Sequence, residues 1–557
     1  MENQLQQLRD LLEAQSRQLQ AQNEQLKEQQ RKMHEMEEQM KNVSSSSLVN
    51  EGAIGGLGSN PAGSGIILAT PSNQEKKDDM PTSIHFKGVT LTPGGFFVAE
   101  SVWRQHGITN DVNTDFRGVP LPGQSASKLS ELNFSGRQSR LSIKGEGKLA
   151  NVKLTGYFEG DFLSAGVTSN NNESNSYTFR QRQFWGQAAF ESGWKFTGGQ
   201  MWSLVTETKK GLDNLTENTP LTIDAQYTVG FSWARQYGFR VTKNLGDRFW
   251  LGMSVEGPQT TLAGKIQNNT TLIAAPGDTG GLYNNQSNYS YNQTPDFVVK
   301  AAWEPGFGHY EVFGVVSTFR ARVFPCANAN ALNPCSVDST IVAPSVAGAF
   351  NDTKVGGGIG ANARWSLFSK KFDLGLHFLG GDGVGRYGTT TLADVTVHPD
   401  GTLEPIHSYQ GLGSIELHPT PKFDIYGYAG AEYAARTAYT TTRVTAAGPP
   451  PVVTTLGVGY GSPLQSNGGC LTETVPGAPG AGNQNLPGAL TACQQDNRIL
   501  IEGTLGYWYR FYQGPKGRLQ VGMQYSYVTR NTWAANTGGD PHGIDNMFFT
   551  SFRYYLP

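Results

Sequence analysis

Alternation of apolar and polar residues with a period of two recurs along most of this chain. It is clearest between residues 138 and 162, where two such runs are separated by the break Leu149–Asn151. In the first run, Leu141 and Ile143 share one parity, whereas Lys144 belongs to the charged parity. Period two with a tight turn between the runs predicts an antiparallel β-hairpin with one apolar and one charged face.

The same pattern predicts sixteen strands between residue 94 and the end of the chain. We expect them near 94–104, 138–148, 151–163, 178–191, 194–205, 226–241, 248–256, 296–304, 309–320, 355–368, 371–380, 406–418, 422–436, 496–511, 516–529 and 544–556. The later strands alternate most cleanly, with Leu519, Val521 and Met523 opposing Arg518 and Gln520.

Connections between these strands alternate in length. Seven of them are tight turns of a few residues, and between them lie eight longer polar loops, for example 257–295, 321–354, 381–405 and 437–495. Short turns on one side and long loops on the other are the signature of an outer-membrane barrel. A soluble sandwich has no reason to sort its loops in this way. Residues 84–557 are therefore predicted to form an all-β domain, a 16-stranded antiparallel transmembrane β-barrel.

Residues 1–41 predict a different kind of structure. Leucine or methionine recurs every seven residues, at Leu5, Leu12, Leu19, Leu26, Met33 and Met40. Sustained heptads predict an α-helical coiled coil, with a single solvated helix as the alternative. Residues 42–83 contain a serine run followed by Gly, Pro and Asn, a composition that predicts a flexible linker.

Composition narrows the function classes. The formal charge of −2 provides no basic field for nucleic acid. Gly 69, Tyr 22, Phe 28 and Trp 10 are an enrichment typical of transmembrane barrels, and the mean hydropathy of −0.40 is compatible with one because half of each strand faces water. The chain contains no apolar run long enough for a spanning helix. Met1 leads directly into the heptads, so we expect a removed secretory signal or a late start.

Several short motifs resemble one known family. They are Gly199-Gln-Met-Trp-Ser203, Arg235-Gln-Tyr-Gly-Phe-Arg240 and Val255-Glu-Gly-Pro258. Together with the heptads, the linker and the strand count, they are similar to the DcaP-like trimeric porins of Gram-negative outer membranes. The resemblance implies a homotrimer, a periplasmic coiled coil and a third loop, residues 206–224, folded into the pore as a constriction. It also implies small anionic solutes such as dicarboxylates.

Charged residues of the lumen and of the loop 206–224 are the candidate pore residues. The loop carries Glu207, Asp213 and Glu217 beside Lys209 and Lys210. The wall supplies basic residues on the lumenal parity, namely Lys144, Arg240, Arg364 and Arg510, and the basic pair Arg180 and Arg182. An acidic loop facing a basic wall would orient polar solutes and select them by charge. The alternative is that these charges only hydrate the lumen.

The four cysteines fall into two local pairs. Cys326 and Cys335 share one predicted outer loop, and Cys470 and Cys493 share another. In an oxidising exterior this arrangement predicts two disulfides that close loops, with zinc binding as the alternative.

No other motif indicates catalysis. Gly383-Val-Gly-Arg-Tyr-Gly388 fits a dinucleotide fingerprint, but no helix is expected after it. The histidines show no pair at metal-ligand spacing, and no nucleophile motif is evident. We therefore expect a passive diffusion porin that is not an enzyme, binds no cofactor or metal, and has outer-membrane lipid and small polar or anionic solutes as partners. A barrel hydrolase and a structural anchor that engages the cell wall through the coiled coil are the alternatives.

Overall fold

The computed structural model describes residues 83–163, 178–224, 227–266, 270–273, 290–473, 493 and 496–557, together with the exposed helical residue Arg31. The coiled coil predicted for residues 1–41 and the linker predicted for 42–83 lie outside the described residues, apart from Arg31 and Ser83.

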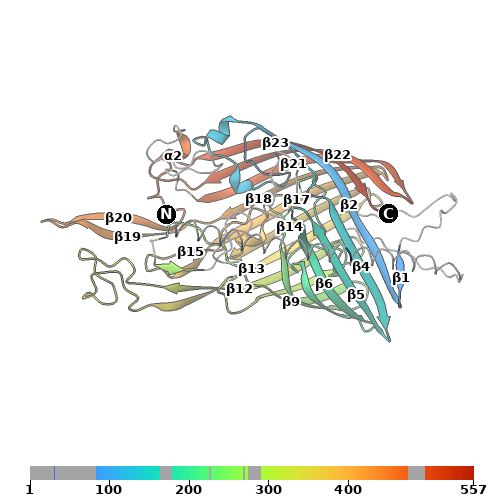
Figure 1. The fold of residues 1–557 in the computed structure, drawn as a ribbon, viewed down its shortest axis with the longest axis horizontal. Helices are drawn as coiled ribbons and strands as arrows, with labels where there is room; N and C mark the ends of the chain where they lie inside the picture. The colour runs from blue at the N-terminus through green and yellow to red at the C-terminus, as the bar shows by residue number, and fades with distance from the viewer. Residues whose placement is uncertain are drawn as a thin grey trace, which may run out of the picture. The chain divides into compact units, whose positions relative to one another are not determined.

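Sixteen long strands form one closed antiparallel barrel (Figure 1). In chain order they are β2 (Val89–Arg104), β4 (Arg140–Leu149), β5 (Val152–Asp161), β6 (Arg180–Phe190), β7 (Trp194–Trp202), β8 (Arg235–Asn244), β9 (Phe249–Glu256), β11 (Asp296–Trp303), β12 (His309–Val323), β13 (Phe350–Leu367), β14 (Phe372–Asp382), β17 (His407–Thr420), β18 (Phe423–Ala434), β21 (Asn497–Gly514), β22 (Gly517–Thr532) and β23 (His542–Tyr555). Each pairs with its neighbour in the chain, and β2 closes the barrel by pairing with both β4 and β23.

The predicted barrel and its sorted loops are confirmed. Seven tight turns, such as Ala150–Asn151 between β4 and β5, alternate with eight longer connections. The largest departure from the predicted strand bounds is in β8, which begins at Arg235 and not at residue 226. The backbone N–H groups of Val229 and Gly230 bond to carboxylates of the opposite wall and not to β7. The apolar alternation of this segment therefore comes from packing inside the barrel.

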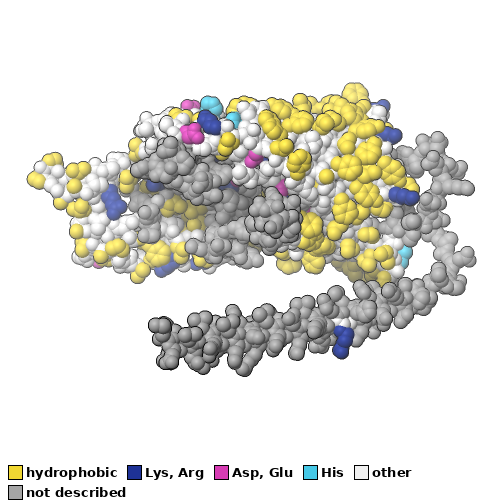
Figure 2. Space-filling view, turned by 45° about the horizontal axis from the view of Figure 1, so that its top comes forward, with side chains coloured by type: hydrophobic (Ala, Val, Ile, Leu, Met, Phe, Trp, Pro, Cys, Tyr) yellow, Lys and Arg dark blue, Asp and Glu magenta, His cyan; other side chains and the backbone are white. Residues whose placement is uncertain are grey.

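The two faces of the strands differ as the alternation requires. On β22, Val521 and Met523 are exposed, whereas Gln520 and Gln524 are buried toward the interior. Hydrophobic side chains cover much of the outer face of the strands (Figure 2). This arrangement places the apolar parity where a bilayer would contact it and the polar parity in the lumen. Among the described residues, no helix is long and apolar enough to cross a membrane.

Shorter elements belong mainly to the long connections. They are β1 (Ile84–Phe86), β3 (Glu131–Ser135), β10 (Thr271–Leu272), β15 (Val395–Val397), β16 (Leu403–Pro405), β19 (Thr437–Ala446), β20 (Val452–Tyr460), α2 (Gly468–Leu471) and 3-10 turns at Phe116–Gly118, Ser125–Lys128 and Gly385–Tyr387. The hairpin β19–β20 extends beyond the barrel on the side of the long loops (Figure 1).

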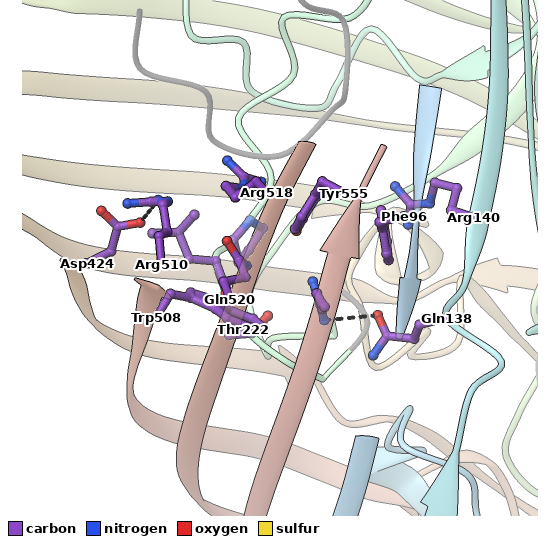
Figure 3. A pocket seen from close by; sticks show the side chains of 13 residues that line it. Phe96, Gln138, Arg140, Thr222, Asp424, Trp508, Arg510, Arg518, Gln520 and Tyr555 are labelled. Atoms are coloured by element: carbon purple, nitrogen blue, oxygen red, sulfur yellow. Dashed lines mark hydrogen bonds and ion pairs between the residues drawn. The ribbon is translucent and has the colours of Figure 1, made fainter. Parts of the chain in front are cut away.

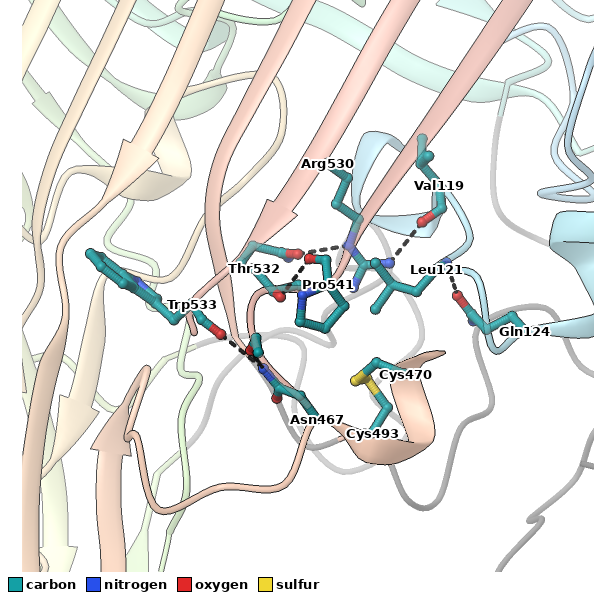
Figure 4. Close-up of a disulfide and its surroundings, with 12 residues drawn as sticks. Val119, Leu121, Gln124, Asn467, Cys470, Cys493, Arg530, Thr532, Trp533 and Pro541 are labelled. Atoms are coloured by element: carbon teal, nitrogen blue, oxygen red, sulfur yellow. Dashed lines mark hydrogen bonds between the residues drawn. A yellow bond between two sulfur atoms is a disulfide. The ribbon is translucent and has the colours of Figure 1, made fainter. Parts of the chain in front are cut away.

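Both predicted disulfides are present. Cys326 pairs with Cys335, and Cys470 of α2 pairs with Cys493 (Figure 4). The second disulfide lies where three outer loops meet, because the Gly123 N–H of the loop after β2 donates to the Cys470 carbonyl, and the Asn467 N–H donates to the Thr537 carbonyl of the loop after β22. It therefore closes its own loop at a point where that loop is bonded to the loop after β2.

Candidate pore and its inserted loops

The connection between β7 and β8, residues 203–234, leaves the wall and crosses the barrel interior. Near β7 it is held by neighbouring strands, because the Leu204 N–H donates to Glu256 at 2.9 Å and the Thr208 N–H donates to Glu311 at 3.1 Å. Buried Lys300 donates to the Thr206 carbonyl at 2.8 Å. Carboxylates and a lysine of the wall thus satisfy backbone groups of the loop near β7, and a short antiparallel bridge between Thr208 and Glu217 satisfies others within the loop.

On the opposite side, the same loop is bonded to β18, β21 and β22. Its Leu221 N–H donates to the Tyr428 hydroxyl at 2.8 Å, and its Ile223 N–H donates to Gln524 at 2.6 Å. The Trp508 indole N–H donates to the Leu221 carbonyl at 2.8 Å. A loop that bonds to strands this far apart around the barrel must narrow the lumen, as the predicted constriction requires.

Glycine allows the loop to touch the wall backbone. Gly230 has a φ of 87°, and a Cβ there would overlap the carbonyl of Gly411 on β17. A Cβ on Gly430 of β18 would overlap the carbonyl of Val229. Only residues without side chains permit this approach, so the loop and the wall are complementary at this point.

Two further loops fold inward, which the sequence did not predict. The loop after β2 contributes Val112 and Phe116, and the loop between β14 and β17 contributes Leu392, to a buried apolar cluster that also contains Phe231 of the crossing loop. The Thr389 hydroxyl donates to the Phe231 carbonyl at 2.9 Å. Apolar residues spaced along predicted polar loops were the available signal, since exposed loops have little reason to carry them.

The basic pair Arg180 and Arg182 is neutralised on the wall. Arg180 donates to both carboxylate oxygens of Asp161, at 2.9 and 3.0 Å. Arg182 donates to Glu159 at 2.8 Å and to Asp161 at 2.6 Å, and it is only 2% exposed. Two arginines and two carboxylates thus form a compact network on β5 and β6. These ion pairs leave little positive charge for a passing solute.

Other predicted wall residues are also partnered. Arg364 donates to Asp373 at 2.7 Å and to Glu416 at 3.2 Å, and it also bonds to Asn218 of the crossing loop. Arg240 bonds to Asn214 of the loop at 2.9 Å, and Lys144 pairs with Glu146 at 2.8 Å. Arg240 and Arg364 therefore brace the loop as well as lining the wall.

The charges of the loop differ in their surroundings. Burial raises the pKa of Glu207 and of Glu217 to about 7, and the nearby charge of Glu311 adds to the effect at Glu207. Lys195 pairs with Asp213 at 2.5 Å. Lys209 is half-buried, and burial lowers its pKa, whereas Lys210 is exposed.

A different set of arginines lines a pocket of about 490 Å³, open solvent included, beneath residues 220–222 of the loop (Figure 3). Arg140, Phe96, Tyr555 and Arg518 lie opposite one another on the adjacent strands β4, β2, β23 and β22. Arg140 stacks on Phe96 and Arg518 stacks on Tyr555, with 5.1 and 3.9 Å from guanidinium carbon to ring centre. Stacking holds each guanidinium in place without neutralising it.

Two more arginines line this pocket. Arg553 donates to Glu100 at 2.8 Å and stacks on Trp508, and Arg510 bonds to Asp424. Arg518 forms no ion pair with any described carboxylate, and its Nε is buried without a hydrogen-bond partner. We call Arg140, Arg510, Arg518 and Arg553 the arginine pocket.

Of the arginine pocket, only Arg510 was among the predicted pore residues. The alternation predicted for residues 516–529 sets Arg518 opposite the apolar positions, whereas Arg140 and Arg553 were not predicted. Arg553 could have been found from its alternation with Phe552 and Tyr554, which face outward.

Comparison with known proteins supports this architecture. No protein-family model matches the chain, and no curated protein matches it. A solved structure of the outer membrane channel DcaP of Acinetobacter baumannii aligns with a TM-score of 0.55 at 14% identity, covering 86% of this chain and all of that one. The chain has the fold of the DcaP channel.

Other porins align less closely with this DcaP-like barrel. An anion-selective porin from Comamonas acidovorans gives a TM-score of 0.42 at 9% identity, covering 84% of this chain and 100% of that one. OmpF of Salmonella typhi, solved with daunomycin, gives 0.42 at 10% identity, covering 85% and 100%.

One hydrogen-bond relay in the DcaP-like barrel has the order of a nucleophile and a base. Ser232 of the crossing loop lies 2.7 Å from Nε2 of His377, and Nδ1 of His377 contacts the side-chain oxygen of Asn362. The Asn362 amide in turn donates to Glu311 at 2.5 Å. Ser232 is 2% exposed and also accepts from Gln410, so the relay fixes the loop to the wall and offers a substrate no approach to the hydroxyl.

Proposed function

We propose that this protein is an outer-membrane channel for passive diffusion of small polar solutes, with a weak preference for anions such as dicarboxylates. The observation that carries the proposal is a closed barrel whose polar lumen is crossed by an inserted loop, with the arginine pocket directly beneath that loop. The DcaP-like fold supports the same reading.

The sign of the preference follows from which charges lack partners. Arg140 is 3.6 Å from Glu159, Arg510 and Arg553 are paired with Asp424 and Glu100, and Arg518 is paired with none of the described carboxylates. Selectivity depends on the charges at the narrowest part of the path. A guanidinium stays charged at any working pH and forms bidentate hydrogen bonds with carboxylates. Arg518 is therefore the residue best placed to attract an anion.

For assembly, we propose a homotrimer with the coiled coil of residues 1–41 in the periplasm. Support comes from the heptads and from the resemblance to trimeric porins. Deleting residues 1–41 should leave the trimer intact, because the barrel walls would supply the larger contact. Size-exclusion chromatography with light scattering in mild detergent tests this expectation, and monomers after the deletion would make the coiled coil the assembly element.

Channel function is tested by reconstituting the full chain into planar bilayers and liposomes. The channel account predicts discrete conductance steps and faster entry of a small dicarboxylate than of a neutral sugar of equal size. A structural anchor around a plugged barrel would show neither. A barrel hydrolase would release product from ester substrates, and this activity would have to disappear in Ser232→Ala to be assigned to the relay.

A further inference from the structure

An apolar groove lies on the outer face of the barrel, over β12, β13, β14 and β17. Its volume is about 550 Å³, open solvent included. In register, Gly380 lies directly between Ile359 and Tyr409, whose side chains are exposed. Two positions away, Ala361 lies opposite the exposed Phe378. Small residues between large ones thus leave a depression in the face that a bilayer would contact.

The groove is polar at the end nearest the long loops. His407 begins β17 there, and its Nδ1 lies 2.6 Å from Asp382, the last residue of β14. Its Nε2 lies 2.6 Å from the Tyr409 hydroxyl. An apolar body with a polar outer end suits an amphipathic molecule that lies along the wall with its polar part toward the exterior.

Two arginines extend the polar border of this surface. The outward positions of β12 are apolar at Val312 and Val316 and charged at Arg320 and Arg322. On the side of the long loops, β12 and β13 continue to pair beyond the last residues that they share with β11 and β14 (Figure 1). Both guanidinium groups therefore lie just past the apolar band, at the level of lipid headgroups.

The charge of these two arginines is not balanced within the described part of the chain. Among the described residues, Arg320 and Arg322 form no ion pair, and Arg322 donates to the neutral side chain of Asn351 at 3.0 Å. A guanidinium binds phosphate through bidentate, charge-assisted hydrogen bonds. Basic residues at a membrane surface also attract anionic lipids. The pair is thus complementary to a phosphorylated headgroup.

The two polar ends of this surface are far apart for a small headgroup. Strands β13 and β14 separate β12 from β17, which at about 4.8 Å per strand places Arg320 and His407 at least about 14 Å apart. A headgroup that reaches both must be wide and must carry hydroxyl groups as well as phosphate. A phosphorylated glycolipid with several acyl chains has this form.

We propose that the outer face of β12, β13, β14 and β17 binds a phosphorylated glycolipid of the outer leaflet. Its phosphate contacts Arg320 and Arg322. Its sugar hydroxyls contact His407 and Asp382, and an acyl chain fills the groove beside Ala361. The arginines favour this ligand over a second copy of the chain, because a protein partner would have to supply carboxylates to them.

The test is native mass spectrometry of the full-length chain released from detergent. The chain is titrated with bisphosphorylated lipid A and with the same lipid after removal of its phosphates. We expect one phosphorylated lipid per chain, and binding at least about tenfold weaker for the dephosphorylated form. Arg320→Gln/Arg322→Gln should weaken binding of the phosphorylated form by a similar factor and leave binding of the dephosphorylated form unchanged. Ala361→Phe, which fills the groove, should weaken binding of both forms.

Lys370→Gln/Lys371→Gln is the matched control, because these exposed lysines lie in the turn between β13 and β14, at the other end of the same strands. It should bind as the unaltered chain does. Heat-dependent mobility on gels verifies that each variant is a folded barrel.

The proposal is overturned if the unaltered chain retains no lipid, if both forms of the lipid bind equally, or if the folded arginine variant binds as the unaltered chain does. A change of oligomeric mass in Ala361→Phe would assign the groove to a contact between copies of the chain and would also overturn it. Binding is read without conductance, so this result and the outcome of the channel tests are separate.

Discussion

Two arginine-rich regions of the lumen differ in how their most available guanidinium is held. On β5 and β6, Arg180 and Arg182 share Asp161 and Glu159 in a buried network, and Arg140 of the arginine pocket also lies 3.6 Å from Glu159. In the arginine pocket, Arg518 rests on Tyr555 and has no described carboxylate as an ion-pair partner. Carboxylate partners fix a guanidinium by cancelling its charge, whereas aromatic faces fix it and leave the charge available. Density of arginine along a chain therefore does not by itself locate the residues that select an anion.

The largest expected effect is on folding stability. Arg182→Gln leaves Glu159 and Asp161 buried with one cation fewer, and removing one partner of a buried pair costs about 3–5 kcal/mol. Arg518→Gln breaks no ion pair with a described carboxylate and loses the contact with Tyr555, whose stacking part is worth about 0.5–1 kcal/mol. Urea unfolding followed by tryptophan fluorescence measures both variants. Equal losses would mean that the two regions are not built differently.

A second, somewhat smaller effect on stability should distinguish substitutions on the two faces of β22. Val521→Lys puts a charge on the exposed apolar face and should cost about 2–4 kcal/mol if this residue lies near mid-membrane. Gln520→Glu, one residue away, places a carboxylate beside Arg518 and Arg553 and should cost little while reducing the preference for anions. Unfolding in lipid vesicles compares the two, and similar losses in both variants would contradict the assignment of faces.

A change of pH should have a smaller effect on the stability of the protein and on its preference for anions. Burial raises the pKa of Glu207 and Glu217 in the crossing loop to about 7, above the usual value of 4.5. The stability linked to their protonated forms is present below pH 4.5 and is lost as pH rises through about 7. Their ionisation also adds negative charge to the loop, so the preference for anions should decline between about pH 5 and pH 9. Reversal potentials of Glu207→Gln/Glu217→Gln should stay flat across this range.

Much of the barrel could be predicted because the features that determine its strands lie close together in the sequence. Side-chain alternation and turn length fix the strands, and the pairing of Cys326 with Cys335 follows from their shared loop. Contacts across the lumen are not local. Nothing near Gly230 indicates that it will rest on Gly411, and nothing near Arg182 indicates that Asp161 and Glu159 will neutralise it. The predicted start of β8 was wrong for the same reason, since the alternation around Val229 reflects contacts of the crossing loop with the opposite wall.

The most direct test of the central claim is the reversal potential of single channels in a salt gradient of about tenfold, a condition in which incompletely screened charges dominate. The account predicts that Arg518→Gln moves the reversal potential toward cation preference, and that the shift shrinks when both solutions are concentrated. Arg180→Gln/Arg182→Gln, compared in the fraction that folds, should shift it less. A larger shift in the double variant than in Arg518→Gln would contradict the account and would mean that the paired arginines of β6 determine the selectivity.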